Sequence, residues 1–303
     1  MAKNEKWTAD QMPDQSGRVA IVTGANSGIG YEAARQLARH GATVIMACRN
    51  PERGEAAVAA IEGEGPAGSV ALMTLDLADL SSVRAFAEAF HQRYDRLDLL
   101  INNAGVMMPP ERWETKDGFE IQFGVNHLGH FALTGLLLDR LLETPRSRVV
   151  TVSSSMARLG EMNFDDLQGE QSYSGRGAYG QSKLANLLFT FELQRRLAAA
   201  GAKTLAVAAH PGYTATDLQR HSRLFRVLNP LVAQKPDKGA LPTLYAAVGE
   251  DVQGGDYYGP DGFQEMRGHP KKVTPPDRAT DEAAAARLWA VSEELTGVRF
   301  EIG

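Results

Sequence analysis

Val19-Ala20-Ile21-Val22-Thr23 runs directly into Gly24-Ala25-Asn26-Ser27-Gly28-Ile29-Gly30 near the start of this 303-residue chain. A short apolar run, a glycine-rich turn and an apolar pattern with helical spacing together predict a strand, a tight turn and a helix. Small residues in such a turn let backbone N–H groups and the positive end of the helix approach a pyrophosphate. The glycines are spaced GxxxGxG rather than GxGxxG, so an ordinary glycine-rich turn is the alternative interpretation of this segment.

The same alternation of apolar runs and helical patterns continues along the chain. Further strands are predicted over 43–48, 70–76, 97–102, 148–153 and 204–209, and helices over 29–40, 51–62, 80–93, 118–142, 179–200 and 281–296. Continuously apolar strands are typical of a parallel sheet that is covered on both faces. We therefore expect an α/β fold with a doubly wound, Rossmann-type parallel sheet, which binds ligands at the carboxyl ends of its strands.

Composition limits the class of protein. With 43% hydrophobic residues the chain can form one large core, so we expect a polar extension over 1–16 and a single domain over 17–303. The net charge of -5 is modest and dispersed, which argues against a nucleic-acid partner. The single cysteine, Cys48, excludes an intramolecular disulfide and a cysteine-based zinc cage. The polar start and the lack of long apolar runs favour a cytoplasmic protein without an integral membrane segment.

The residues after the second predicted strand bear on the choice of dinucleotide. An NAD-binding protein usually places an acid there, which accepts hydrogen bonds from the ribose 2′-OH. The chain instead reads Ala47-Cys48-Arg49-Asn50, so no acid repels a 2′-phosphate and Arg49 offers a planar cation. We expect NADP(H) in preference to NAD(H), unless Arg49 is an ordinary solvated residue.

A candidate proton donor lies in the second half of the chain. Tyr179 and Lys183 are four residues apart on one predicted helix, so their side chains share a face. A free phenol has a pKa of about 10, and a nearby ammonium should lower it toward the working range of an acid or base. Ser154 follows the fifth strand, where its hydroxyl is suited to stabilising charge on a substrate oxygen. The alternatives are that the tyrosine packs in a helix beside a solvated lysine, and that Ser153 or Ser155 takes the place of Ser154.

Several motifs occur in the order that is found in the short-chain dehydrogenase/reductase family, which the chain resembles from about residue 17 to its C-terminus. They are the TGxxxGIG segment, Asp76, Asn102-Asn103-Ala104-Gly105, Asn126, Ser154, Tyr179-x-x-x-Lys183 and His210-Pro211-Gly212. Further segments are similar to the retinol dehydrogenase-type branch, which also resembles protochlorophyllide reductases: Ala47-Cys48-Arg49-Asn50, Tyr257-Tyr258-Gly259-Pro260 and Leu288-Trp289-x-Val291-Ser292-Glu293-Glu294. The resemblance implies an NADP(H)-dependent oxidoreductase acting on small hydrophobic alcohols, aldehydes and ketones.

The resemblance also implies roles for individual residues. Tyr179 is the general acid and base, Lys183 also binds the nicotinamide ribose, Ser154 holds the substrate oxygen, and Asn126 helps to hold a water that connects Lys183 to solvent, unless it is a buried asparagine that satisfies a helix backbone. The residues expected to bind the cofactor are Gly24, Asn26, Ser27, Gly28, Ile29, Gly30, Arg49, Asp76, Leu77, Asn102, Asn103, Ala104, Gly105, Tyr179, Lys183, Pro211, Gly212, Thr214 and Thr216. Of these, Asp76 and Leu77 should flank the adenine, and the two threonines should bind the carboxamide.

Two stretches are longer than in compact family members. Residues 162–167 are expected to form a flap, and 217–236 form a basic amphipathic segment suited to a lid over a hydrophobic pocket. That segment is also compatible with a membrane contact or with simple core packing. His127, His130 and His210 lack the spacing of a metal site, so we expect them to be structural and expect no metal.

By resemblance to the family, the helices over 118–142 and 179–200 are expected to form a homodimer or tetramer interface. Their apolar residues are Leu133, Leu136, Leu137, Leu187, Leu188 and Phe191, and packing against the protein's own sheet would use many of the same residues. Two other functions remain open beside alcohol or carbonyl chemistry. They are a regulatory sensor that binds NADP(H) with little turnover, and a reductase of conjugated C=C bonds.

Overall fold

The computed structural model describes residues 6–214 and 234–302. Within these ranges one eight-stranded sheet has the order β3-β2-β1-β4-β5-β6-β7-β8, in which only the β7–β8 pair is antiparallel. The strands are β1 Val19–Thr23, β2 Thr43–Cys48, β3 Ser69–Thr74, β4 Leu99–Asn102, β5 Arg148–Val152, β6 Leu205–Ala209, β7 Tyr257–Pro260 and β8 Pro270–Lys272. The order reverses between β1 and β4, which is where doubly wound sheets open a crevice for ligands.

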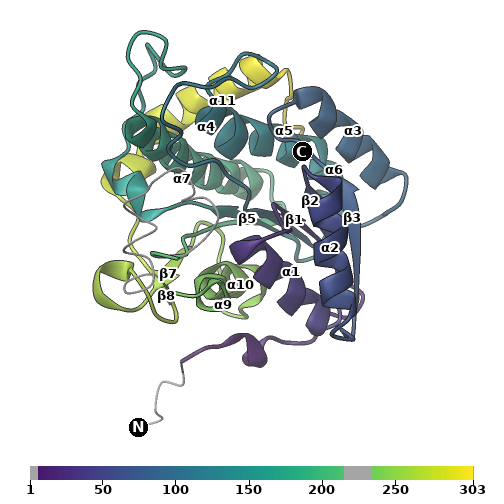
Figure 1. Cartoon of the computed structure of the whole chain (residues 1–303). Coiled ribbons are helices and arrows are strands. Elements are labelled where there is room, and N and C mark those ends of the chain that lie inside the picture. Colours follow the sequence, from purple (N-terminus) through teal and green to yellow (C-terminus); the bar gives the residue numbers. More distant parts are fainter. Residues whose placement is uncertain (1–5, 215–233, 303) are drawn as a thin grey trace.

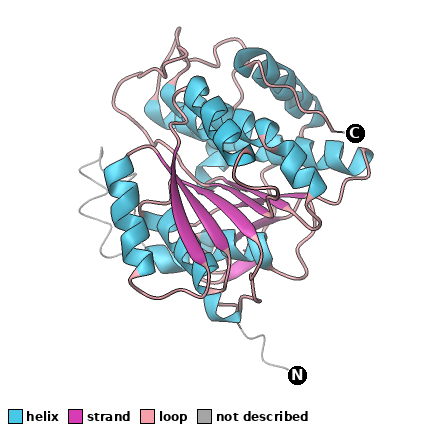
Figure 2. Cartoon of the chain, turned by 90° about the vertical axis from the view of Figure 1, so that its right-hand side faces the viewer, coloured by secondary structure: helices cyan, strands magenta, loops and turns pink. Residues whose placement is uncertain are grey.

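Helices cover both faces of this sheet, as Figures 1 and 2 show. One face carries α1 (Gly28–Arg39), α2 (Pro51–Glu62), α9 (Pro236–Gly239) and α10 (Leu241–Val248). The other carries α3 (Leu80–His91), α4 (Ile121–Phe123), α5 (Gly129–Leu136), α6 (Leu138–Glu143) and α7 (Gly175–Ala199), with α11 (Glu282–Thr296) packed outside α7. This confirms the predicted α/β architecture.

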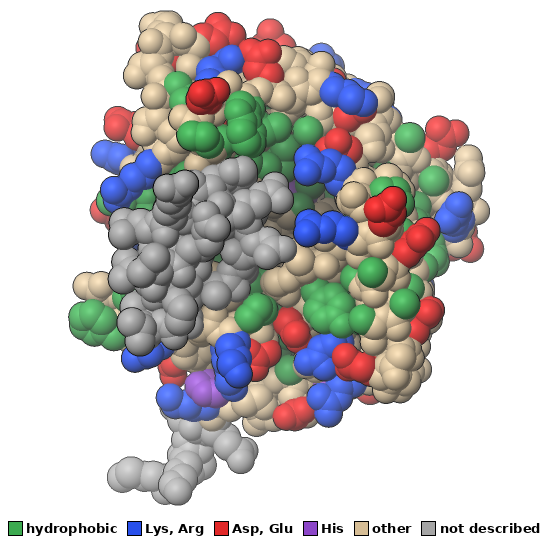
Figure 3. All heavy atoms as spheres, in the orientation of Figure 1, with side chains coloured by type: hydrophobic (Ala, Val, Ile, Leu, Met, Phe, Trp, Pro, Cys, Tyr) green, Lys and Arg blue, Asp and Glu red, His purple; other side chains and the backbone are tan. Residues whose placement is uncertain are grey.

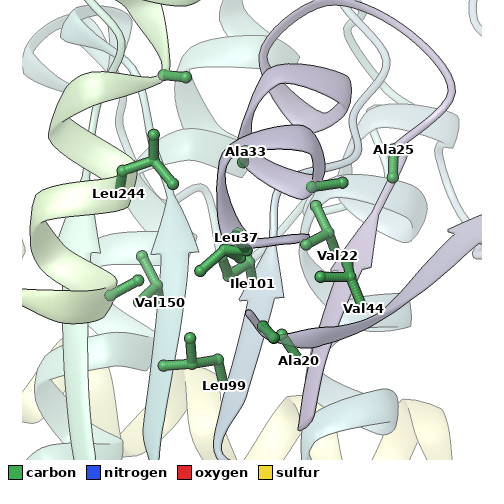
Figure 4. Packing of buried hydrophobic residues seen from close by; sticks show 14 of the residues in the cluster. Ala20, Val22, Ala25, Ala33, Leu37, Val44, Leu99, Ile101, Val150 and Leu244 are labelled. Carbon is green, nitrogen blue, oxygen red and sulfur yellow. The ribbon is translucent and has the colours of Figure 1, made fainter. Parts of the chain in front are cut away.

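The apolar character of the strands follows from this three-layer arrangement. Every residue of β1 is buried, because Ala20 and Val22 face α1 while Val19 and Ile21 face the opposite layer. Figure 4 shows Ala20 and Val22 beside Leu37 of α1, with Leu99 and Ile101 of β4 in the same cluster. A strand that contacts helices on both faces has no polar face, which explains why the sequence has continuous apolar runs instead of an alternation of apolar and polar residues.

The predicted helix over 118–142 is interrupted in the structure. It begins only at Ile121, continues as a π-helical turn over Gly124–Leu128, and breaks again at Leu137 between α5 and α6. The helix passes very close to other segments, because a Cβ on Gly129 would lie 2.6 Å from the carbonyl oxygen of Leu77. A helical spacing of apolar residues predicts the overall path of such a segment but not its local change of helix type.

The polar extension is not detached from the domain. Among its described residues, Met12 and Gln15 are buried, and the Trp7 ring packs edge-on against Tyr245 of α10 at 5.1 Å. The described residues contain no helix that is both long and apolar enough to cross a membrane.

Candidate functional site

A cleft opens at the carboxyl ends of the central strands, in the place expected for a doubly wound sheet. Fifteen of the residues predicted to bind a cofactor line it together: Gly24, Asn26, Ser27, Gly28, Ile29, Gly30, Arg49, Asp76, Leu77, Asn103, Ala104, Gly105, Tyr179, Lys183 and Pro211. Residues far apart in sequence therefore meet at one site. Figure 3 views the molecule in the orientation of Figure 1 and shows Lys and Arg side chains interspersed with Asp and Glu on this face.

The glycine-rich turn forms the floor of the cleft and has no room for larger side chains. Gly24 has a left-handed backbone, with φ of +66°, and Gly28 begins α1 with φ of +57°. A Cβ on Gly30 would lie 2.5 Å from both the Gly24 carbonyl oxygen and the Asn103 amide nitrogen. The turn is thus packed directly against the loop after β4, which leaves its backbone close to the cleft.

Thr23, which sequence reasoning did not select, joins these two loops. Its buried hydroxyl accepts hydrogen bonds from the backbone N–H groups of Asn103 and Ala104, each at 2.9 Å. In return, Asn103 donates its side-chain amide to the Thr23 carbonyl at 2.8 Å. The neutral His130 ring lies 2.8 Å from the same hydroxyl. Buried hydrogen bonds around Thr23 therefore hold the two loops of the cleft floor together.

Two arginines lie at the β2 side of the cleft. Arg49 lines it as predicted, and Arg53, which was not predicted, lines it one helical turn further on, in α2. Both side chains are exposed, and neither forms an ion pair within the described ranges. The Asn50 side chain caps α2 by accepting a hydrogen bond from the Arg53 N–H at 2.8 Å, which fixes the backbone position of Arg53. The cleft therefore carries two uncompensated positive charges at this end.

Tyr179 lines the cleft, and of the candidate serines Ser153 lines it while Ser154 is not among the lining residues. Tyr179 is buried on α7, and the Ser154 hydroxyl lies near enough to its phenol to lower the phenol's pKa. Burial raises the pKa of Tyr179 to about 12, against the smaller lowering effect of Ser154. This differs from the sequence-based expectation that Lys183 lowers the tyrosine's pKa, because removal from water outweighs the other influences on the phenol.

Lys183 is also buried and shares the face of α7 with the tyrosine. Its Nζ lies 5.8 Å from the centre of the Tyr179 ring and donates to the Val152 carbonyl at 3.1 Å. Burial lowers the pKa of Lys183 to about 8. The Lys183 amine is therefore held close to the phenol, and in most molecules it is protonated at neutral pH.

Asn126 lies in the π-helical turn, behind the cleft wall, and does not line the cleft. Its side chain accepts from the Val106 N–H at 2.7 Å and donates to the Val106 carbonyl and the Ser182 hydroxyl at 3.0 and 2.9 Å. The side chain thus satisfies the backbone of the loop after β4 and a serine of α7, rather than the backbone of a helix. A role in holding a water remains a prediction.

The other predicted cofactor residues occupy different positions. Asn102 is buried and donates to Thr134 at 3.0 Å, so its side chain points away from the cleft. Gly212 follows Pro211 with φ of +67°, and the Thr214 hydroxyl donates to the Pro211 carbonyl at 2.9 Å. Thr216 and nearly all of the predicted lid over 217–236 fall outside the described residues.

The predicted flap is held firmly against α7. The buried side chain of Gln181 accepts from the Asn163 N–H at 2.9 Å and donates to the Leu167 carbonyl at 3.0 Å. One glutamine side chain therefore fastens both ends of the 162–167 stretch to the helix that carries Tyr179. The stretch is therefore anchored to α7 at both of these points, and its action as a flap stays a prediction.

The three histidines that sequence reasoning judged structural lie apart from the cleft lining. Burial lowers the pKa of His127 to about 3 and that of His130 to about 4, so both rings are neutral near pH 7. His127 contacts Ser292 of α11 at 2.8 Å. His210 is buried beside Glu265, at 3.0 Å. Within 6–214 and 234–302, no group of three potential ligands is arranged to hold a metal ion.

The apolar face assigned to an oligomer interface is covered by the chain itself. Leu133, Leu137, Leu187 and Leu188 are fully buried, while Leu136 and Phe191 pack against the core at its edge. The C-terminal segment closes over this region, because Val298 and Phe300 would contact a Cβ on Gly135. These leucines thus pack against the protein's own sheet and C-terminal segment.

Comparison with known proteins gives consistent matches over this architecture. A family model described as short chain dehydrogenase matches residues 18–226. Retinol dehydrogenase 12 of Mus musculus is 45% identical over 291 residues, covering 94% of this chain and 88% of that protein. Retinol dehydrogenase 13 of Homo sapiens is 45% identical over 294 residues, covering 93% and 85%.

Solved structures show the same similarity. An uncharacterized protein from Mycobacterium paratuberculosis is 48% identical with a TM-score of 0.83, and the match covers 98% of this chain and all of that one. A Shigella flexneri protein described as a short chain dehydrogenase, complexed with NADP, is 27% identical with a TM-score of 0.64 and covers 80% and 96%.

Proposed function

Since this chain belongs to the short-chain dehydrogenase family and is an oxidoreductase of its retinol dehydrogenase-like branch, we propose that it reduces or oxidises a hydrophobic carbonyl or alcohol with NADP(H). The observation that carries the proposal is that Tyr179 and Lys183 line the cleft together, with Ser154 near the phenol. The nicotinamide would carry the hydride when bound.

The residues of the cleft fit a dinucleotide. A Cβ at Gly30 would strike backbone, so the turn is kept bare of side chains where a pyrophosphate would approach. Arg49 and Arg53 supply two cations at the end of β2, where no acid follows the strand. A 2′-phosphate would find charge-assisted hydrogen bonds there, which supports NADP(H) over NAD(H).

The protein's own groups would manage the proton. With a pKa of about 12, Tyr179 is protonated at neutral pH and can donate to an oxygen that becomes negative during reduction. The Ser154 hydroxyl, which lies near the phenol, would hold the same oxygen. Once the phenol loses its proton, the buried ammonium of Lys183 stabilises the phenolate, since opposite charges interact strongly away from water.

The cleft also has an apolar side beside this cluster. Val106, Met107 and Val125 line it, and a flexible thioether adapts to substrates of different shape. This supports a hydrophobic substrate, in line with the names of the retinol dehydrogenases to which the chain is similar. A cytoplasmic location and a homo-oligomeric state stay predictions.

The test is a panel of aldehydes and ketones of increasing chain length, assayed with NADPH and with NADH and followed by product analysis. Faster turnover with NADPH, and an alcohol as the product, are expected. Tight NADPH binding without turnover would favour a sensor, and a saturated carbonyl formed from an unsaturated one would favour C=C reduction. Failure to bind either dinucleotide would contradict the proposal.

A further inference from the structure

Two consecutive residues that are not glycine adopt left-handed backbone conformations between β7 and β8. Gln264 has φ of 50° and Glu265 has φ of 57°. Side chains with a Cβ rarely adopt this conformation, and such strain persists only where surrounding contacts impose it. The Gln264 side chain is exposed and forms no hydrogen bond with the described residues, whereas Glu265 turns its carboxylate inward. The turn is held by these contacts of Glu265 together with backbone hydrogen bonds of the same loop, among them Glu265 N–H to the Gly262 carbonyl at 3.0 Å.

The Glu265 carboxylate joins two segments that border the catalytic end of the cleft. Its Oε1 and Oε2 accept from Nη2 of Arg158 at 3.1 and 3.2 Å, and Oε2 lies 3.0 Å from Nε2 of His210. Arg158 belongs to the short 3₁₀ helix over Ser155–Leu159, which is capped by the Ser154 hydroxyl. His210 directly precedes Pro211, which lines the cleft.

Both partners of Glu265, Arg158 and His210, also form hydrogen bonds with backbone groups nearby. The Arg158 guanidinium also donates to the Thr274 carbonyl at 3.0 Å. On the other side, Nδ1 of His210 accepts the Gly212 N–H at 3.3 Å, which leaves Nε2 as the donor to Glu265. His210 is fully buried, while the side chain of Glu265 is 26% exposed. One carboxylate thus connects the Ser154 turn with the Pro211 turn.

We propose that Glu265 is a positioning residue, which fixes the turn that carries Ser154 relative to the turn that carries Pro211. It acts through Arg158 and His210 and does not itself line the cleft. This inference rests on the proposed function for its catalytic consequence, because a misplacement of about 1 Å can cost up to about a hundredfold in rate. The ordering of the two turns is a property of the protein alone.

Two glycine variants distinguish the effect of the Glu265 carboxylate from the effect of the left-handed backbone strain. Glu265→Gly removes the contacts and relieves the left-handed strain at that residue, while Gln264→Gly relieves the neighbouring strain and keeps the carboxylate. Arg158→Gln, at a 43% exposed side chain, releases only the Ser154 side. All three changes lie outside the hydrophobic core.

Hydrogen–deuterium exchange followed by mass spectrometry on the full chain, without added ligand, reads the two turns directly. Glu265→Gly should exchange about tenfold faster over 155–160 and over 211–214, Arg158→Gln over 155–160 alone, and Gln264→Gly should match the wild type. In the NADPH assay, kcat should fall at least about tenfold in Glu265→Gly and stay at the wild-type value in Gln264→Gly.

Unchanged exchange in Glu265→Gly, or equal effects of the two glycine variants, would overturn the inference. A wild-type protein that turns over no carbonyl would instead refute the proposed function, while the exchange rates still decide whether Glu265 orders the turns. Wild-type turnover together with full activity of Glu265→Gly would refute the catalytic consequence alone.

Discussion

The glycine-rich turn offers the sharpest structural test of the cofactor cleft, through Gly30→Ala. The added methyl would lie 2.5 Å from the Gly24 carbonyl oxygen, which must move about 0.9 Å to reach an ordinary contact of 3.4 Å. It would lie equally close to the Asn103 amide, whose 2.8 Å hydrogen bond to the Thr23 carbonyl would be disturbed. Overpacking of this kind costs about 1–3 kcal/mol, and a perturbed hydrogen bond adds about 1 kcal/mol.

Part of this cost is offset, because alanine is favoured over glycine in a helix by about 1 kcal/mol. The free energy of unfolding should therefore fall by about 1–3 kcal/mol, which lowers the Tm by several degrees. Displacement of the Gly24 backbone moves the cleft floor, so the Kd for NADPH should rise at least tenfold, or about 1.4 kcal/mol.

The assay is NADPH fluorescence titration together with thermal unfolding of the protein alone. Gly177→Ala is the matched control, because it makes the same change in α7, where the nearest atom would lie 3.6 Å from the new Cβ. The control should bind NADPH like the wild type and unfold at the same or a higher temperature. NADPH binding by Gly30→Ala within about twofold of the wild type would refute the assignment of this turn as the cleft floor.

Three further outcomes are expected. Arg49→Ala should weaken NADPH binding by about tenfold and leave NADH binding nearly unchanged, since the lost charge-assisted hydrogen bond contributes about 1.5 kcal/mol or more. Equal losses of affinity for both dinucleotides in titrations would count against a contact between Arg49 and the 2′-phosphate. Ser154→Ala should lower kcat about a hundredfold or more, measured with a saturating aldehyde, and an unaffected kcat would remove the serine from the site. The free energy of unfolding should fall as the pH drops below 6.5, because the unfolded chain protonates His127 and His130 while the folded protein holds their pKa values at about 3 and about 4. The free energy should change by at most about 1.4 kcal/mol per pH unit for each ring. A Tm that stays constant between pH 7 and pH 5 in thermal unfolding would contradict this expectation.

The sequence predicted β1 to β6 because each strand is a continuous apolar run between helical patterns. It did not identify β7 and β8, which are four and three residues long and contain Pro260 and Pro270. β7 pairs with β6 and β8 pairs with β7, and pairing between distant segments leaves no periodicity in the local sequence. The helix α10 was also missed, since its eight residues include one small polar side chain, Thr243, and no polar face to mark a helical period.

The residues of the candidate site were predictable where a local pattern limits them. Tyr179 and Lys183 share a helix face and the glycines share a turn, so spacing alone places them. Thr23 and Glu265 depend on contacts with segments that are 80 and 107 residues away, and no local pattern indicates such contacts. Arg53 could have been predicted, because it follows Arg49 by one helical turn at the start of a predicted helix.

The pKa of Tyr179 shows a limit of pairwise reasoning from sequence. The neighbouring lysine suggested a lowered value, but spacing along a helix does not report how deeply the phenol is buried. Burial keeps the tyrosine protonated, which suits a proton donor in the direction of reduction.

The most direct test of the account is the turnover of an aldehyde by NADPH in Tyr179→Phe, beside Tyr245→Phe as the matched control. Tyr245 also has a pKa raised to about 12, but it bonds to Asp251 on the far side of the sheet from Tyr179. We expect kcat to fall by at least about a hundredfold in Tyr179→Phe, with the Kd for NADPH almost unchanged and the control fully active. A Tyr179→Phe protein that keeps more than about a tenth of the wild-type kcat would contradict the assignment of Tyr179 as the proton donor.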